Sequence, residues 1–327
     1  MADDTADRMR KRVSGSRIGL WLRLEANRWV VAAIPLFSVF AFLAVVGLVR
    51  PPLLDAPLEH VGDIFETYVG AIVTAVTLVV AINQLVISQE LGTLSDQRDR
   101  MDGALAFRSA VETTLDRETV PTDPAAFLGL LVAESRRAGE SLERAIDPDG
   151  PDGDVHEYAH ELIENAEAVE ARLDGATFGS YEVVGAALDF NYSRKLHDAR
   201  RFNAERDDDR TEEVAQSLDR LVDVLELFGP AREHVKTLYF QWELIDLSRA
   251  LLYSAIPTLA VMLAMVLYFD PDAAAGSVLG VESTVWLAAA AFTVGLLPFA
   301  LLTSYILRIA TVTKRTLSIG PFVLREE

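Results

Sequence analysis

The hydrophobic residues of this chain are concentrated in four long blocks, at positions 29–49, 67–87, 250–269 and 284–307. None of the four blocks contains Asp, Glu, Lys, Arg or His. A helix of about 20 apolar residues, rising about 1.5 Å per residue, crosses the hydrocarbon core of a bilayer. Four such blocks are too many to bury inside the remaining polar chain. The pattern therefore predicts a protein with four membrane-spanning helices.

The basic clusters that flank these spans fall on one side of the predicted membrane. The clusters are Arg8, Arg10, Lys11, Arg12, Arg17, Arg23 and Arg28, then Arg98, Arg100 and Arg108, and finally Arg308, Lys314, Arg315 and Arg325. The loop at 270–283, between the third and fourth spans, has no basic residue. Because basic flanks stay in the cytoplasm, we expect a multi-pass cell-membrane protein with both termini and the region between spans two and three in the cytoplasm.

The region between spans two and three has the pattern of packed helices. Asp123 followed by Pro124 is typical of a helix start, and positions 155–173 carry apolar residues at helical spacing. The second span lacks a strong break after its end, so it is predicted to continue as a helix to about Leu115. A further helix is predicted over 181–204.

The last part of this region carries an apolar seam suited to helix pairing. Its members are Val214, Leu218, Leu221, Leu225 and Phe228. Gly229 and Pro230 are expected to end that helix, and a new helix is expected to run from Ala231 into the third span.

These patterns predict an all-α fold, a four-span helical membrane protein with a helical cytoplasmic domain inserted between spans two and three. The expected regions are a basic N-terminal segment (1–28), spans one and two (29–90), the cytoplasmic domain (91–245), spans three and four (246–308) and a cytoplasmic tail (309–327).

The charge of the chain is strongly negative and is concentrated in the predicted cytoplasmic domain. The 327 residues have a formal net charge of −19, and positions 91–245 contain 34 Asp and Glu against 17 Lys and Arg. No basic stripe is available to replace counterions on phosphates, which argues against nucleic-acid binding. The absence of Cys excludes disulfides, thiolate metal sites and cysteine nucleophiles.

The sequence HEYAH at 156–160 matches the HExxH pattern of zinc metalloproteases. Histidines at i and i+4 share a helix face and can bind one zinc ion, while the Glu serves as general base. The context argues against this chemistry, because Asp154 and Glu161 flank the motif and no third ligand stands out. We interpret His156 and His160 as solvent-facing histidines. A zinc site, with or without protease activity, remains the alternative.

One face of the second span is small or polar along its whole length. Its residues are Thr67, Gly70, Thr74, Thr77, Ala81, Gln84 and Ser88. Small residues let membrane helices approach closely, and polar groups can hydrogen-bond between them. The stripe therefore indicates a helix-packing face, and the alternative is the lining of a pore in an oligomer. No ionisable residue lies within a span, which argues against proton-coupled transport.

Two segments resemble uncharacterised multi-span membrane proteins of halophilic archaea. They are QELG at 89–92 with DQRDRM at 96–101, and RTLSIGPF at 315–322. The acidic, lysine-poor composition is similar to that of proteins from salt-rich cytoplasm, where salt screens the repulsion between surface charges. The resemblance implies a source and a topology, and no activity.

The chain lacks a convincing active site, a phosphate-cradling loop and a nucleotide motif. The leading hypothesis is thus a non-enzymatic scaffold or sensor that sits in the lipid bilayer and docks a protein partner, or further copies of itself, through its cytoplasmic helices. The alternatives are an oligomeric ion channel lined by span two and a membrane-associated zinc protease.

Overall fold

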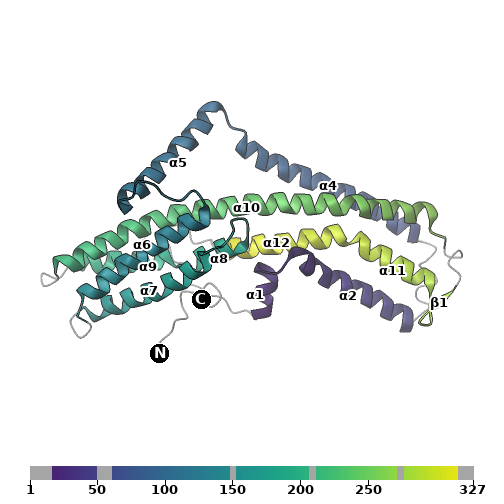
Figure 1. Ribbon diagram of the computed structural model, residues 1–327. Coiled ribbons are helices and arrows are strands. Elements are labelled where there is room, and N and C mark those ends of the chain that lie inside the picture. The colour runs from purple at the N-terminus through teal and green to yellow at the C-terminus, as the bar shows by residue number, and fades with distance from the viewer. Residues whose placement is uncertain (1–16, 50–60, 148–151, 206–210, 271–275, 316–327) are drawn as a thin grey trace. The chain divides into compact units, whose positions relative to one another are not determined.

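The computed structural model describes residues 17–49, 61–147, 152–205, 211–270 and 276–315, and they are almost entirely helical (Figure 1). The helices are α1 (Arg17–Leu24), α2 (Arg28–Val49), α4 (Val61–Glu90), α5 (Leu94–Leu115), α6 (Pro124–Ala145), α7 (Gly153–Leu173), α8 (Tyr181–Asp189), α9 (Tyr192–Ala204), α10 (Glu212–Tyr268), α11 (Ser283–Gly295) and α12 (Leu297–Arg315). The predicted all-α class is confirmed. The basic residues at 8–12 and the end of the tail at 316–327 lie outside the described residues.

The chain divides into two compact units. The acidic unit consists mainly of Gly92–Phe240, and the span unit consists of Trp21–Leu91 and Gln241–Thr311. Helix α10 contributes its first part to the acidic unit and its last part to the span unit.

A short hairpin in the span unit is the exception to the helical structure of the described chain. Strands β1 (Ser277–Val278) and β2 (Val281–Glu282) pair antiparallel, with Val278 opposite Val281. Leu279 and Gly280 both have positive φ, at 55° and 80°. This is the backbone that a two-residue type I′ turn requires.

The acidic unit has its own hydrophobic core, built on the contact between α6 and α7. The predicted start of α6 is confirmed, because the Asp123 carboxylate accepts a hydrogen bond from the Ala126 N–H at 2.9 Å. Gly139 of α6 allows this close packing, since a Cβ there would lie 2.8 Å from Leu162 Cδ2 of α7. The predicted seam on α10 is also confirmed, and all five of its residues are at most 2% exposed.

Helix α10 passes through Gly229 and Pro230, so the predicted break there is wrong. A proline inside a helix costs about 3 kcal/mol. Packing on both sides outweighs this cost. Phe228 is fully buried and meets Phe190 edge-on, with ring centroids 4.8 Å apart. Gly229 is required, because a Cβ there would lie 2.8 Å from the ring of Tyr192.

Two other helix predictions need correction. The helix predicted over 181–204 is divided into α8 and α9, because Phe190 turns inward to fill the core and is fully buried. The second span does not continue to Leu115, since α4 ends at Glu90 and α5 starts at Leu94. Thr93 begins α5 with a reciprocal capping box, in which its side chain and that of Asp96 each bond the other's backbone N–H.

The four predicted spans are all helical in the structure. Four stretches are long and apolar enough to cross a membrane: Arg28–Val49, Gly62–Gln84, part of Glu212–Tyr268, and Ser283–Lys314. Large apolar side chains on these helices are exposed, such as Phe37 at 73% and Ile256 at 72%. The fourth span is interrupted at Leu296, where Pro298 lacks the N–H that would continue the hydrogen-bond ladder.

Helix α4 buries one face against α10 and α11. Phe65, Ile72 and Val79 recur every seven residues on this face, and each is at most 1% exposed. Phe65 stacks on Phe292 of α11, with ring centroids 4.7 Å apart. On α11, Gly295 admits the ring of Tyr68, which a Cβ would meet at 2.8 Å.

A group of buried charged side chains, hereafter the charged cluster, joins three helices of the span unit. It consists of Arg28, Glu243 and Arg308, at the start of α2, on α10 and on α12. Arg28, which is 4% exposed, donates to the carbonyl oxygens of Leu22 at 3.1 Å and of Ser304 at 3.0 Å. The Leu22 carbonyl belongs to the last turn of α1, where a cation is favourable.

Arg308 completes the charged cluster. Its guanidinium lies 2.7 Å from the Glu243 carboxylate and donates to the Ala26 carbonyl at 2.8 Å. Glu243 is 5% exposed, so this ion pair is shielded from water. Hydropathy could not reveal the pair, because both residues lie outside the uncharged blocks.

We predict that Glu243→Gln and Arg308→Gln each lower the free energy of unfolding by about 3–5 kcal/mol, because each change leaves a buried charge without its partner. The double variant should lose less than the sum of the two losses, since the side chains interact directly. Unfolding in detergent, followed by circular dichroism, measures these differences.

The exposed pair of Arg98 and Asp102, whose charged atoms lie 3.6 Å apart, is the matched control. Asp102→Asn should change the free energy of unfolding by less than about 1 kcal/mol. Strictly additive losses at Glu243 and Arg308 would show that the buried pair is not coupled.

A second prediction concerns Glu233 in the acidic unit. Burial raises the pKa of Glu233, but its ion pairs with Lys236 and Arg232 outweigh burial and hold the pKa below its ordinary value of 4.5. A carboxyl with a lowered folded-state pKa stabilises the fold above its ordinary pKa, and this contribution is lost as the pH falls through the folded-state value. Stability should therefore fall on acidification below about pH 5, and less steeply in Glu233→Gln.

Thermal unfolding measured between about pH 6 and pH 3 tests this expectation for Glu233. Glu182→Gln, which removes an exposed carboxylate on α8, controls for the loss of one negative charge. If the thermal stability of the wild-type chain and that of Glu233→Gln fell equally with pH, the expected role of Glu233 would be wrong.

Candidate functional site

The two histidines of the HEYAH motif lie near the start of α7. The side chain of His160 is 59% exposed, and its Nδ1 lies 3.0 Å from the Glu143 carboxylate on α6. Its Nε2 lies 3.5 Å from Glu164, one turn further along α7. Among the residues that the structure describes, no group of three or more His, Asp or Glu is arranged to hold a metal ion. The described residues therefore provide no third ligand for a zinc ion at His156 and His160.

The seven small or polar residues of the second span from Thr67 to Ser88, hereafter the α4 stripe, are all exposed within the single chain. The hydroxyls of Thr67, Thr74 and Thr77 donate to carbonyl oxygens four residues earlier, at 2.9 to 3.0 Å. A Cβ added at Gly70 would meet no atom within 4 Å. The face of α4 that packs against other described helices is the opposite one, which carries Phe65, Ile72 and Val79. No described residue covers the stripe.

Asn83, next to the stripe, has a partner within the chain. The Ser248 hydroxyl of α10 donates to the side-chain oxygen Oδ1 of Asn83 at 2.8 Å. This polar contact joins α4 to α10, in addition to the aromatic packing of α4 against α11.

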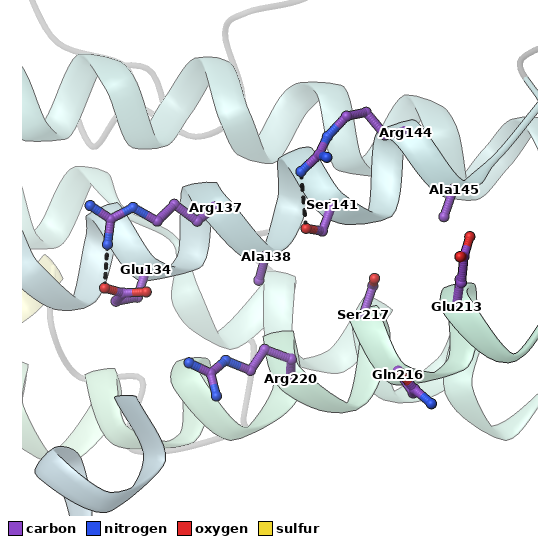
Figure 2. Close-up of a pocket in the computed structure, with 10 residues that line it drawn as sticks. All are labelled: Glu134, Arg137, Ala138, Ser141, Arg144, Ala145, Glu213, Gln216, Ser217 and Arg220. Carbon is purple, nitrogen blue, oxygen red and sulfur yellow. Dashed lines mark hydrogen bonds and ion pairs between the residues drawn. The ribbon is translucent and has the colours of Figure 1, made fainter. Parts of the chain in front are cut away.

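The acidic unit contains a concave site that the sequence did not indicate. A cleft of about 590 Å³, hereafter the arginine cleft, lies between α6 and the first turns of α10 (Figure 2). It is lined by Glu134, Arg137, Ala138, Ser141, Arg144 and Ala145 of α6 and by Glu213, Gln216, Ser217 and Arg220 of α10. On both helices these positions follow the spacing i, i+3, i+4 and i+7, so each helix turns one face toward the cleft.

The three arginines of the cleft differ in their bonding. Arg137 pairs with Glu134, which is 8% exposed and also receives Arg117 at 3.0 Å. Arg144 donates to the Glu140 carbonyl at 3.0 Å and to the Ser141 hydroxyl at 3.2 Å, and neither is a carboxylate. No hydrogen bond or ion pair is found for the Arg220 guanidinium in the described part of the chain.

Electrostatics around Arg220 reflect the acidic surface of α10. Burial raises the pKa of Asp223, and the neighbouring carboxylates of Glu226 and Asp219 raise it further, while Arg220 opposes the rise. Arg220 is thus a cation beside several carboxylates, with its own hydrogen-bond donors unused.

The arginine cleft offers hydrogen-bond donors from two helices. Its lining contains guanidinium, hydroxyl and amide groups, together with the carboxylates of Glu134 and Glu213. Guanidinium groups bind carboxylate and phosphate oxygens in a bidentate manner.

Comparison with known proteins places the chain in a family. The model described as "Family of unknown function (DUF7972)" matches residues 1–327. The chain belongs to this family. A search of curated proteins and a search of solved structures each found no match. The family assignment is consistent with an unknown activity.

Sequence reasoning missed the arginine cleft for a physical reason. Arg137 and Arg144 are seven residues apart, which does place them on one helix face. Their partner Arg220 lies far along the chain, and only the pairing of α6 with α10 brings the three together. The signal in the sequence is a set of residues, several of them polar, at i, i+3, i+4 and i+7, which occurs once on α6 and once on α10.

Proposed function

We propose that this DUF7972 chain is an integral membrane protein that binds a cytoplasmic ligand or partner without catalysing a reaction. Its four apolar helices carry exposed apolar side chains suited to lipid contact. The basic residues that flank them support a topology with both termini and the acidic unit in the cytoplasm. The protein would act as a sensor or scaffold, with the arginine cleft as its docking site.

The observation that carries this proposal is the arginine cleft itself. Positions 91–245 contain 34 acidic against 17 basic residues, and three of the arginines lie around one concave surface. Its volume lies within the range of about 300–1,000 Å³ that is usual for ligand sites. The guanidinium groups of the lining bind oxyanions, and this supports a binding function.

The proposal predicts that the cleft is occupied in the cell. The chain has no cysteine, so Ser217→Cys introduces a single reporter thiol into the cleft. Cytoplasmic extract should slow maleimide labelling of this thiol in washed membranes several-fold. Ser109→Cys, on the exposed side of α5, is the matched control and should be labelled at the same rate with and without extract. Equal rates at Ser217→Cys would overturn the proposal.

A second candidate function is an oligomeric channel lined by α4. The observation that favours it is the exposure of the whole α4 stripe within one chain. Threonine hydroxyls that donate to their own helix still offer oxygen atoms as acceptors along such a face. Small residues there would also permit close contact between copies.

The channel candidate predicts that α4 faces α4 of another copy. Thr74→Cys should form a disulfide-linked dimer on mild oxidation in native membranes, whereas Val80→Cys, exposed outside the stripe, should not. Purified protein in bilayers should conduct ions, and Thr77→Val or Gln84→Leu should alter the conductance. A monomer in detergent with no cross-link and no conductance would remove this candidate.

A further inference from the structure

We infer that the ligand of the arginine cleft is a small anion with several negative charges, carried by phosphate or carboxylate groups. This inference rests on the proposed function, and it names the class of ligand. It follows from the state of the arginines, from the donors around them and from the charge of the rest of the unit.

The first step is that Arg144 and Arg220 lack carboxylate partners among the residues that the structure describes, in a region where carboxylates are abundant. Most arginines described in this unit are paired, such as Arg172 with Asp189 and Arg200 with Glu226. Neither of these two arginines forms an ion pair with a described carboxylate, although positions 91–245 contain 34 acidic against 17 basic residues. An anion bound in the cleft would supply a partner for them.

The second step concerns the donors that remain available. Arg220 has all five N–H groups to offer, and Arg144 uses only its Nε and Nη2 atoms within the chain. The exposed Ser141 hydroxyl of α6 adds a further donor. Donors from two helices around one concave surface suit an oxyanion with oxygens on several sides.

The third step is the arrangement of charge along the cleft. Figure 2 shows Arg137 and Arg220 toward one end and Glu213 at the other, next to Ala145. Glu134 is already shared by Arg117 and Arg137. The arginine end is therefore the attractive one for an anion.

The fourth step explains why the anion is small. An acidic protein would bring its charge against a surface on which carboxylates outnumber basic groups two to one. A small solute inside the cleft responds mainly to the nearest charges, because ionic screening limits the field of exposed groups to about 8 Å at physiological salt. The volume of about 590 Å³ also suits a small molecule.

The test uses the purified full-length chain in detergent and isothermal titration with sodium pyrophosphate, with citrate and with chloride at matched ionic strength. Wild-type protein should bind pyrophosphate, citrate or both, and should show no saturable binding of chloride. Arg220→Gln should weaken that binding about tenfold or more, since hydrogen bonds between charged groups are lost. Arg144→Gln combined with Arg220→Gln should weaken it further.

Arg200→Gln is the matched control, because Arg200 is exposed, lies outside the cleft and pairs with Glu226. It should leave binding unchanged. Unaltered thermal unfolding of the cleft variants would show that they remain folded. Binding of pyrophosphate alone assigns a phosphate ligand, and binding of citrate alone assigns a carboxylate ligand.

Binding that persists in the Arg144→Gln/Arg220→Gln variant would overturn the inference, because the anion would then sit elsewhere. Absence of binding to both anions, with Ser217→Cys still protected by extract, would overturn the small-anion class and leave the proposed docking function standing. If neither anion binds and extract also fails to protect Ser217→Cys, both the small-anion inference and the proposed docking function are overturned.

Discussion

The span unit depends on the rule that charges removed from water need partners. Arg308 meets this rule by contacting the Glu243 carboxylate of α10 and the Ala26 carbonyl before α2. Arg28 meets it through carbonyl oxygens at the end of α1 and on α12. Apolar packing is not directional and by itself specifies the alignment of neighbouring helices only weakly. The charged cluster instead defines which turns of α2, α10 and α12 lie beside one another.

Helix α10 shows how one helix serves two environments. Its first part presents a narrow apolar seam to the core of the acidic unit, where Val214 and Leu225 are buried. Its last part is apolar on all sides, as Tyr253 and Ile256 are exposed while Met262 is buried. The helix tolerates Pro230 between these parts because contacts on both sides hold its axis, and Gly229 gives Tyr192 the space it needs.

The position of the arginine cleft is a consequence of the same packing. The seam of α10 fixes the rotation of the helix about its axis, and this rotation turns Ser217 and Arg220 toward α6. On α6, the buried side that contacts α7 likewise leaves Ser141 and Arg144 at its edge. Binding groups at the rim of a packed interface are held by the core beneath them. This favours a preformed site over one that forms on binding.

Periodicity and composition determined much of this protein in advance. The four apolar blocks, the start of α6 at Asp123 and the α10 seam were readable because each depends on residues close together in the chain. The small and polar residues of the α4 stripe could be recognised for the same reason, although the sequence does not show what they contact. The tertiary structure alone decided where helices end or continue against local signals. Core contacts keep α10 helical through Pro230, where the sequence predicts a helix end. They also end α8 at Phe190, where the sequence predicts a continuous helix. The tertiary structure also decided which distant charges meet, in the pair of Glu243 with Arg308 and in the arginine cleft, because such contacts depend on helix rotation and pairing that no local pattern encodes.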